Sequence, residues 1–450
     1  MQSSVSDRTA ADKRRELIRR RIVNLIFLFY LLLIFEGALR KWIFPQYQKI
    51  IFFARDPVVL YIYLLAFKHK FWPKRNQIYS YAIFIMKAGT VVMLIQLFSS
   101  TASLISLLYG WRMWFSYIPL AIIIGEALTI EDIKRLMRLT LIIAIPLSLL
   151  VTKQIHSPYT AYINKTVDAG VFYSNSGNSG GDITRVTATF SFFHSWQIFL
   201  GSIIAFCLIF WALPKQERGF RLPLLLIATA ATLISFAADI TRLPTYLAII
   251  IVAGALCGSM LMRDKKKRLR IQAISVSLII GGVLIGGLLF SDADKVRTSR
   301  FNNPNAGLSR RVEGMFTGQT RSFWKRSMLG IGLGAGSRGA SLIGGVKGAS
   351  EDEWNNHITE AGTIFGVMYI LFRIMLVWWL FRNAVKATRV SNNPMAMILF
   401  AFSSPIILIW YLTSKGQTHA YGWLLVGLCI AANHLGDMKA EEQAKIKGPA

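Results

Sequence analysis

The sequence is poor in acidic residues, in charge overall and in cysteine. It has 23 Asp and Glu against 51 Lys and Arg, so its formal net charge is +28, while only 16% of its residues are charged and 54% are hydrophobic. A single soluble core cannot absorb so much apolar surface. The cysteines Cys207, Cys257 and Cys429 lie in apolar runs without the spacing of metal ligands. We therefore interpret them as packing or lipid-facing residues rather than as a disulfide framework.

Apolar stretches long enough to cross a bilayer as helices recur along the whole chain. The basic residues 1–21 are followed by an apolar run without a small-x-small cleavage site, which predicts an uncleaved first helix. We expect about twelve transmembrane helices, each of roughly 17 to 25 residues. They lie near residues 22–39, 50–67, 78–97, 104–128, 139–151, 190–213, 222–240, 243–262, 271–290, 361–381, 395–412 and 421–434. The fold class predicted is an all-α polytopic membrane protein.

The basic residues indicate an orientation, because Lys and Arg in short loops stay in the cytoplasm. With both termini cytoplasmic, most of these residues fall on that side, in segments 8–21, 68–75, 134–138, 215–221, 263–270, 382–389 and 439–447. The excess of Lys and Arg is thus explained by the membrane topology, and we do not expect a nucleic-acid partner. The predicted organisation is a cytoplasmic N-terminus (1–21), helices one to nine (22–290) with a periplasmic loop (152–189), a large periplasmic loop (291–360), helices ten to twelve (361–435) and a cytoplasmic tail (436–450).

The large external loop opposes this charge rule, because it is strongly basic. It contains Arg310, Arg311 and Arg321 among ten Lys and Arg residues. The guanidinium group binds phosphate oxygens in pairs and stays charged at any relevant pH. Any one of these arginines is better explained as a solvated surface charge, since long loops cross the membrane regardless of charge. The set, together with Arg185 and Arg242 at the ends of other helices, favours an anion-binding site.

Several charges lie at membrane depth. Arg242 occupies a very short turn between apolar segments, three residues after Asp239. Because a charge at this depth costs about 2.5 to 3.5 kcal/mol, Arg242 should face a polar cavity or pair with Asp239. For the same reason Glu36, Lys87 and Arg373 are expected to form pairs between helices.

An acidic group precedes the predicted tenth helix and offers a proton acceptor. It comprises Glu351, Asp352 and Glu353, followed by His357 and Glu360. A general base must lie within reach of the proton that it removes. A solvated helix start explains the acidic residues equally well, because carboxylates favour helix N-termini.

A glycine-rich stretch, residues 330–339, matches a dinucleotide-binding pattern through Gly334, Gly336 and Gly339. No strand-helix-strand unit surrounds it, so we reject that reading. We expect these glycines to let the backbone turn tightly or approach a ligand closely.

Together these features resemble the O-antigen polymerase and O-antigen ligase superfamily, bacterial enzymes that act on undecaprenyl-pyrophosphate-linked glycans at the periplasmic face. The topology and the second half of the chain carry the resemblance. Its motifs are Thr184-Arg185-Val-Thr-Ala-Thr-Phe190, Thr241-Arg242, Arg321 followed after ten residues by Gly332, Gly330-Ile-Gly-Leu-Gly334 and Glu360-Ala-Gly362. Glu36-Gly-Ala-Leu-Arg40-Lys-Trp42 and Arg55-Asp56-Pro57 resemble a subgroup found with exopolysaccharide gene clusters, which favours polymerisation over ligation.

The resemblance implies a glycosyltransferase of the bacterial inner membrane that needs no metal or other cofactor. Arg185, Arg242 and Arg321 would hold the donor pyrophosphate as catalytic residues, with Arg310 and Arg311 as further substrate-binding residues. The His-Asn pair common in this family before the Glu-x-Gly element is absent, and its positions fall near Glu351 and Asp352. Glu351 is therefore the expected base, with Glu353 and His357 as alternatives that also bind substrate. The implied partners are the lipid-linked glycan donor, a glycan acceptor, membrane lipids and polysaccharide assembly proteins.

Two other classes of function stay open. A lipid-linked glycan flippase or polysaccharide transporter has a similar number of helices, although such proteins typically show repeated halves and substrate charges near the membrane midplane. A non-catalytic subunit of a polysaccharide export machine is the third alternative.

Overall fold

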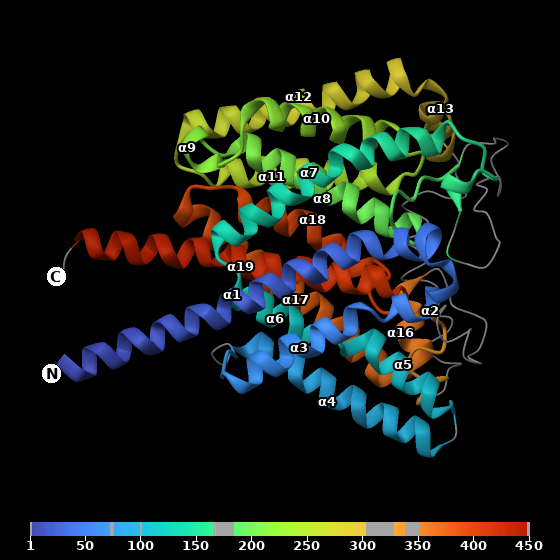
Figure 1. Cartoon of the computed structure of the whole chain (residues 1–450), viewed down its shortest axis with the longest axis vertical. Helices are drawn as coiled ribbons and strands as arrows, with labels where there is room; N and C mark the ends of the chain where they lie inside the picture. Colours follow the sequence, from blue (N-terminus) through green and yellow to red (C-terminus); the bar gives the residue numbers. More distant parts are fainter. Residues whose placement is uncertain are drawn as a thin grey trace.

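The computed structural model describes residues 2–72, 76–99, 101–165, 167, 184–302, 328–337 and 352–447, drawn in colour in Figure 1. Helices and turns account for these residues, and none of the described ranges contains a strand. Within the described residues, nine helical segments are long and apolar enough to cross a membrane, and α10 and α18 are shorter apolar helices. The coarse prediction of an all-α, membrane-embedded protein is confirmed.

Every apolar stretch predicted to cross the membrane is helical in the structure. The first half comprises α1 (Gln2–Ala38), η1 (Leu39–Ile43), η2 (Pro45–Tyr47), α2 (Gln48–Phe52), α3 (Arg55–Lys68), α4 (Gln77–Phe98), α5 (Leu104–Phe115), α6 (Ile118–Ala127), α7 (Ile130–Ile155), η3 (Tyr162–Asn164) and α8 (Phe193–Ala212). The second half comprises α9 (Lys215–Arg218), α10 (Leu222–Ala237), α11 (Leu243–Met260), α12 (Lys265–Leu289), α13 (Ser291–Phe301), α16 (Glu353–Ala361), α17 (Thr363–Ser391), α18 (Met395–Ile409) and α19 (Gly416–Lys447).

Two predicted helices are broken. The stretch expected at 104–128 is split between α5 and α6, because Pro119 near the start of α6 has no amide hydrogen to donate to the Phe115 carbonyl. The stretch expected at 50–67 is likewise divided between α2 and α3. Irregular backbone at membrane depth is tolerated where the protein itself supplies hydrogen-bond partners. Here the Tyr63 hydroxyl donates to the Ser116 carbonyl in the α5–α6 break.

Glycines on facing helices bring α6 and α19 close together at the centre of the bundle. A Cβ atom added at Gly125 would lie 2.4 Å from Ile430, and one added at Gly427 would lie 2.6 Å from Ile124. Small residues allow such close approach between membrane helices, where packing rather than hydrophobicity drives association. The buried α19 therefore forms much of the core, and Trp423 on it is only 1% exposed.

The helices run back and forth between two ends of the bundle. Both termini and α9 lie at one end in Figure 1, whereas α2, α13 and α16 lie at the other. At the first end, the Arg19 guanidinium donates to the Ala127 carbonyl. At the second, the Gln96 side chain of α4 donates to the Glu360 carbonyl of α16. We call this second end the site end, because Arg185, Arg242 and Glu353 all lie there.

Candidate functional site

Three arginines from separate segments meet at the site end and form what we call the arginine cluster: Arg185 before α8, Arg242 in the α10–α11 turn and Arg300 in α13. The Arg242 Nη1 donates to the Arg300 carbonyl at 3.1 Å, and the Arg300 Nη1 donates to the Ile240 carbonyl at 3.4 Å. Burial, followed by the charges of Arg185 and Arg242, lowers the pKa of Arg300 to about 10. The charge of Asp239 opposes this shift, so three half-buried arginines face one described carboxylate, and the excess of positive charge favours a bound anion.

The turn that carries Arg242 is held by Asp239. The buried carboxylate accepts hydrogen bonds from the Thr241 amide at 2.8 Å and from the Thr241 hydroxyl, a local turn typical of Asp. Burial raises the pKa of Asp239, while the Thr241 bonds and the charge of Arg297 oppose the rise. Among the described residues, Asp239 thus bonds Thr241 and Arg242 bonds Arg300, so the simple Asp239–Arg242 pair that the sequence allowed is not formed.

Aromatic side chains continue from the arginine cluster toward the α18–α19 connection. The Arg185 guanidinium lies 4.9 Å from the centroid of the Phe193 ring, which stacks on His194 at 4.0 Å. The Lys415 ammonium lies 3.0 Å from His194 Nε2 and 3.5 Å from the centre of the Tyr411 ring. These four side chains beyond Arg185 are half-buried, and we call them the aromatic strip.

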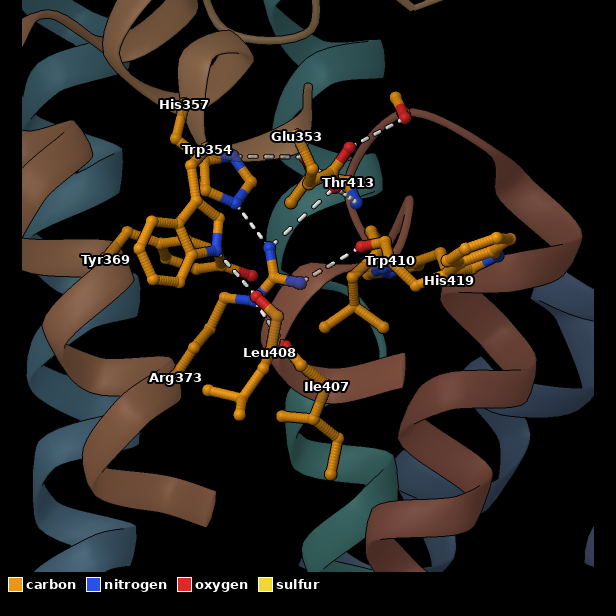
Figure 2. Close-up of polar contacts among 12 residues, drawn as sticks. Glu353, Trp354, His357, Tyr369, Arg373, Ile407, Leu408, Trp410, Thr413 and His419 are labelled. Atoms are coloured by element: carbon orange, nitrogen blue, oxygen red, sulfur yellow. Dashed lines mark hydrogen bonds and ion pairs between the residues drawn. The ribbon is translucent and has the colours of Figure 1, made fainter. Parts of the chain in front are cut away.

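Beside this strip, Arg373 closes the end of α18 (Figure 2). The last carbonyls of a helix have no partner within it. Arg373, which comes from α17 and is fully buried, donates from Nε to the Ile407 carbonyl at 2.5 Å and from Nη2 to the Trp410 carbonyl at 3.0 Å. The Trp354 indole donates to the Leu408 carbonyl at 2.6 Å. A cation at a helix C-terminus also complements the helix dipole.

Glu353 and His357 complete this buried network. Glu353 Oε1 accepts from the Thr413 amide at 2.7 Å and lies 3.9 Å from Arg373. Its Oε2 accepts from the Ser414 hydroxyl at 2.9 Å. His357 Nε2 contacts Arg373, which can only donate, so Nε2 must accept and the proton must sit on Nδ1, facing Thr413 Oγ1 at 3.4 Å. Burial and the Arg373 charge lower the pKa of His357, in agreement with this neutral form.

Glu360 anchors the glycine-rich segment. Its carboxylate accepts from the Trp114 indole at 3.1 Å, from the Gly334 amide at 2.9 Å and from the Gly336 amide at 3.2 Å. Burial raises the pKa of Glu360 to about 8 against the opposing effect of these donors. The tight turns expected of the glycines are confirmed, since Gly332 has a φ of +115° and Gly334 one of +75°.

The structure places only part of the predicted site. Arg185 and Arg242 come together with Arg300, and Glu353 and His357 come together in the buried network. Arg310, Arg311, Arg321 and Glu351 lie outside the described residues. The expected pairing of charges between helices is confirmed for Glu36, which pairs with Arg55 at 2.7 Å, and for Arg373 with Glu353. It is wrong for Lys87, which is exposed on α4 and forms no ion pair with any described residue.

Sequence reasoning did not single out Arg300, His194 or Lys415. Arg300 stood among other loop arginines, and nothing local ties it to Arg242, which lies 58 residues away. Lys415 did carry a signal, because it is a charge in a short connection between two apolar stretches. His194 is a lone histidine at a helix start and carried none.

In the part of the chain that the structure describes, no three His, Cys, Asp or Glu side chains are grouped so as to hold a metal ion. The described site consists of fixed cations, aromatic rings and buried hydrogen bonds. No protein-family model matches this chain, and no curated protein is similar to it.

Proposed function

We propose that this protein transfers or polymerises undecaprenyl-pyrophosphate-linked oligosaccharide at the periplasmic face of the bacterial inner membrane, in the synthesis of a surface polysaccharide or exopolysaccharide. The observation that carries the proposal is the convergence of Arg185, Arg242 and Arg300 from three separate segments. A pyrophosphate carries enough negative charge to offset several arginines. It leaves as an anion when the sugar is transferred, and cations fixed in advance stabilise the charge that develops.

The proposed site is external if both termini are cytoplasmic, because α13, which carries Arg300, lies at the opposite end of the bundle (Figure 1). Twelve crossings, made by the nine long segments together with α10, α18 and α19, would return the chain to its starting side. Fusions of a cytoplasmic fluorescent reporter and of a periplasmic phosphatase to the C-terminus test this orientation. Activity of the phosphatase there would contradict it.

The acceptor glycan has a suitable surface in the aromatic strip. Aromatic rings pack against the apolar faces of sugars, and Phe193 contacts Arg185 while Tyr411 contacts Lys415. Glu353 and His357 are buried beneath the α18–α19 connection that carries Tyr411 and Lys415. We propose that these two residues hold that connection in place. Their direct contact with substrate stays a prediction, as does the role of Glu351 as the base.

The proposal is tested by the fate of the lipid-linked repeat unit in a strain that lacks this protein. Membrane-sidedness labelling should find the repeat unit accumulated in the outer leaflet, with no long polymer. Accumulation in the inner leaflet would instead support a flippase.

The arginine cluster is tested by complementing that strain with variants. Arg242→Ala and Arg300→Ala should each lower the rate of polymer formation by about a hundredfold to a thousandfold, the usual effect of removing one group that stabilises a developing charge. Lys295→Ala is the matched control, because Lys295 lies on the same helix as Arg300, is exposed and pairs only with a surface aspartate. Full polymer in both cluster variants at normal protein levels would favour a non-catalytic assembly subunit.

A further inference from the structure

A second group of basic side chains lies at the site end, where α1 gives way to η1, η2 and α2. Arg40 and Arg55 both pair with Glu36. The guanidinium groups of Arg40 and Arg112 each lie 5.2 Å from the centre of the Phe52 ring. We call these three arginines the second basic group.

The positive charge of this group exceeds its negative charge. Glu36 pairs with Arg55 at 2.7 Å and with Arg40 at 3.1 Å, and Asp56 binds Arg112 through two hydrogen bonds at 2.7 and 2.9 Å. These are the two carboxylates among the described contacts of the group. The neighbouring Lys41 is fully buried, and its side-chain nitrogen donates to the Thr187 hydroxyl and the Ala188 carbonyl. Among the described contacts, three arginines face two carboxylates, and a bound anion would offset this difference.

A buried donor of this group also lacks an acceptor. Arg55 is fully buried, and its Nη2 has no hydrogen-bond partner among the described residues. Its Nη1 makes only a long bond of 3.4 Å to the Gly416 carbonyl. Arg40 and Arg112, by contrast, keep 10% and 16% of their side chains exposed. The group therefore contains two partly exposed arginines and a third, buried one.

The backbone beside this group carries a row of exposed apolar side chains. Ile43, Phe44, Tyr47, Ile50 and Phe53 are between 43% and 71% exposed, on a segment of short irregular helices. Such a row, next to a transmembrane helix end, is typical of a segment that rests against lipid tails at the membrane interface. An anionic group that binds Arg40 and Arg112 from this surface would therefore lie next to exposed apolar side chains of the protein.

We propose that the second basic group binds the phosphate of a membrane lipid, whose tail packs on the apolar row of residues 43–53. Arginine forks suit the terminal oxygens of such a headgroup, and the apolar row distinguishes a lipid from a free phosphate. Arg40 also donates to the Ser191 hydroxyl at 3.2 Å, so the bound lipid would lie beside the segment that carries Arg185. The inference concerns lipid binding alone, and it can therefore fail or succeed independently of the transfer reaction.

Native mass spectrometry of the detergent-purified full chain with dioleoyl phosphatidic acid tests this proposal. The wild type should retain one lipid in a saturable manner, and Arg40→Gln/Arg112→Gln should weaken its affinity by at least about tenfold. Asp56→Asn should strengthen binding, because it removes a negative charge from Arg112 while keeping an oxygen acceptor for Tyr117. The affinity is thus expected to fall in the double arginine variant and to rise in Asp56→Asn. A variant that merely failed to fold would not bind the lipid more tightly.

Lys49→Gln is the control for general attraction of anionic lipid, since Lys49 is exposed on the same segment. It should leave the affinity within about twofold of the wild type, as expected for an exposed charge that makes no fixed contact. Equal losses in Lys49→Gln and in the double variant, or weaker binding in Asp56→Asn, would overturn the proposal. Displacement of the lipid by millimolar inorganic phosphate would also overturn it and would indicate a site for soluble anions.

Discussion

Replacing Arg373 with methionine should destabilise the protein strongly, although methionine is apolar and of similar length. The change removes the donors to the Ile407 and Trp410 carbonyls at the end of α18 and leaves the buried Glu353 without its cation, 3.9 Å away. Breaking a buried pair by removing one partner costs about 3 to 5 kcal/mol. The hydrogen bonds of a charged donor account for part of that sum, at about 1.5 to 3 kcal/mol each, and are not additive.

The expected change in melting temperature follows from the length of the chain. An unfolding entropy of about 2.1 cal/mol/K per residue over 450 residues gives roughly 1 kcal/mol for each degree. Arg373→Met should therefore lower the apparent melting temperature by about 3 to 5 °C, measured by tryptophan fluorescence or by size-exclusion chromatography after heating in one detergent. Arg382→Met is the matched control, because Arg382 lies on the same helix and is exposed.

A second substitution tests the physical cause. Glu353→Gln removes the negative charge but keeps an oxygen for the Thr413 donors, while its new NH2 group faces the Ser414 hydroxyl, which can also accept. In the double variant with Arg373→Met, no buried carboxylate is left without a cation, so the combined loss should be smaller than the sum of the two single losses. Equal melting temperatures for Arg373→Met and Arg382→Met would contradict this explanation. So would a double variant whose loss of melting temperature equals the sum of the losses in Arg373→Met and Glu353→Gln.

Two further predictions concern stability. The pKa of Glu360 rises from 4.5 to about 8 on folding, so the stability that this shift contributes is complete below pH 4.5 and is lost as the pH rises from there to about 8. Relative to Glu360→Gln, the wild type should therefore lose melting temperature between pH 4.5 and 8, and parallel curves for the two proteins over this range would contradict this. Gly427→Ala should cost about 1 to 3 kcal/mol, because its Cβ would lie 2.6 Å from Ile124, whereas Gly287→Ala, with nothing within 4 Å, should be neutral or slightly stabilising in the same thermal assay.

The position of the helices was largely predictable from the sequence, because a membrane helix must be continuously apolar over a length fixed by the bilayer. The breaks within these helices could not be predicted from the sequence. The stretch 104–128 is mostly apolar, yet it is divided near Pro119, where the Tyr63 hydroxyl from another helix accepts from the Leu120 amide and donates to the Ser116 carbonyl. Hydropathy does not encode a partner on a distant segment.

The candidate site, too, was predictable from the sequence only in part. The sequence by itself determined that Arg242 and Arg373 need polar surroundings, because a charge at membrane depth is costly wherever the chain folds. Only the tertiary structure decided what those surroundings are. Arg300 meets Arg242 across 58 residues, and Arg373 caps a helix that begins only after its own helix has ended. Such contacts depend on which helices pack side by side, and that choice rests on shape, as where Gly125 and Gly427 let α6 approach α19.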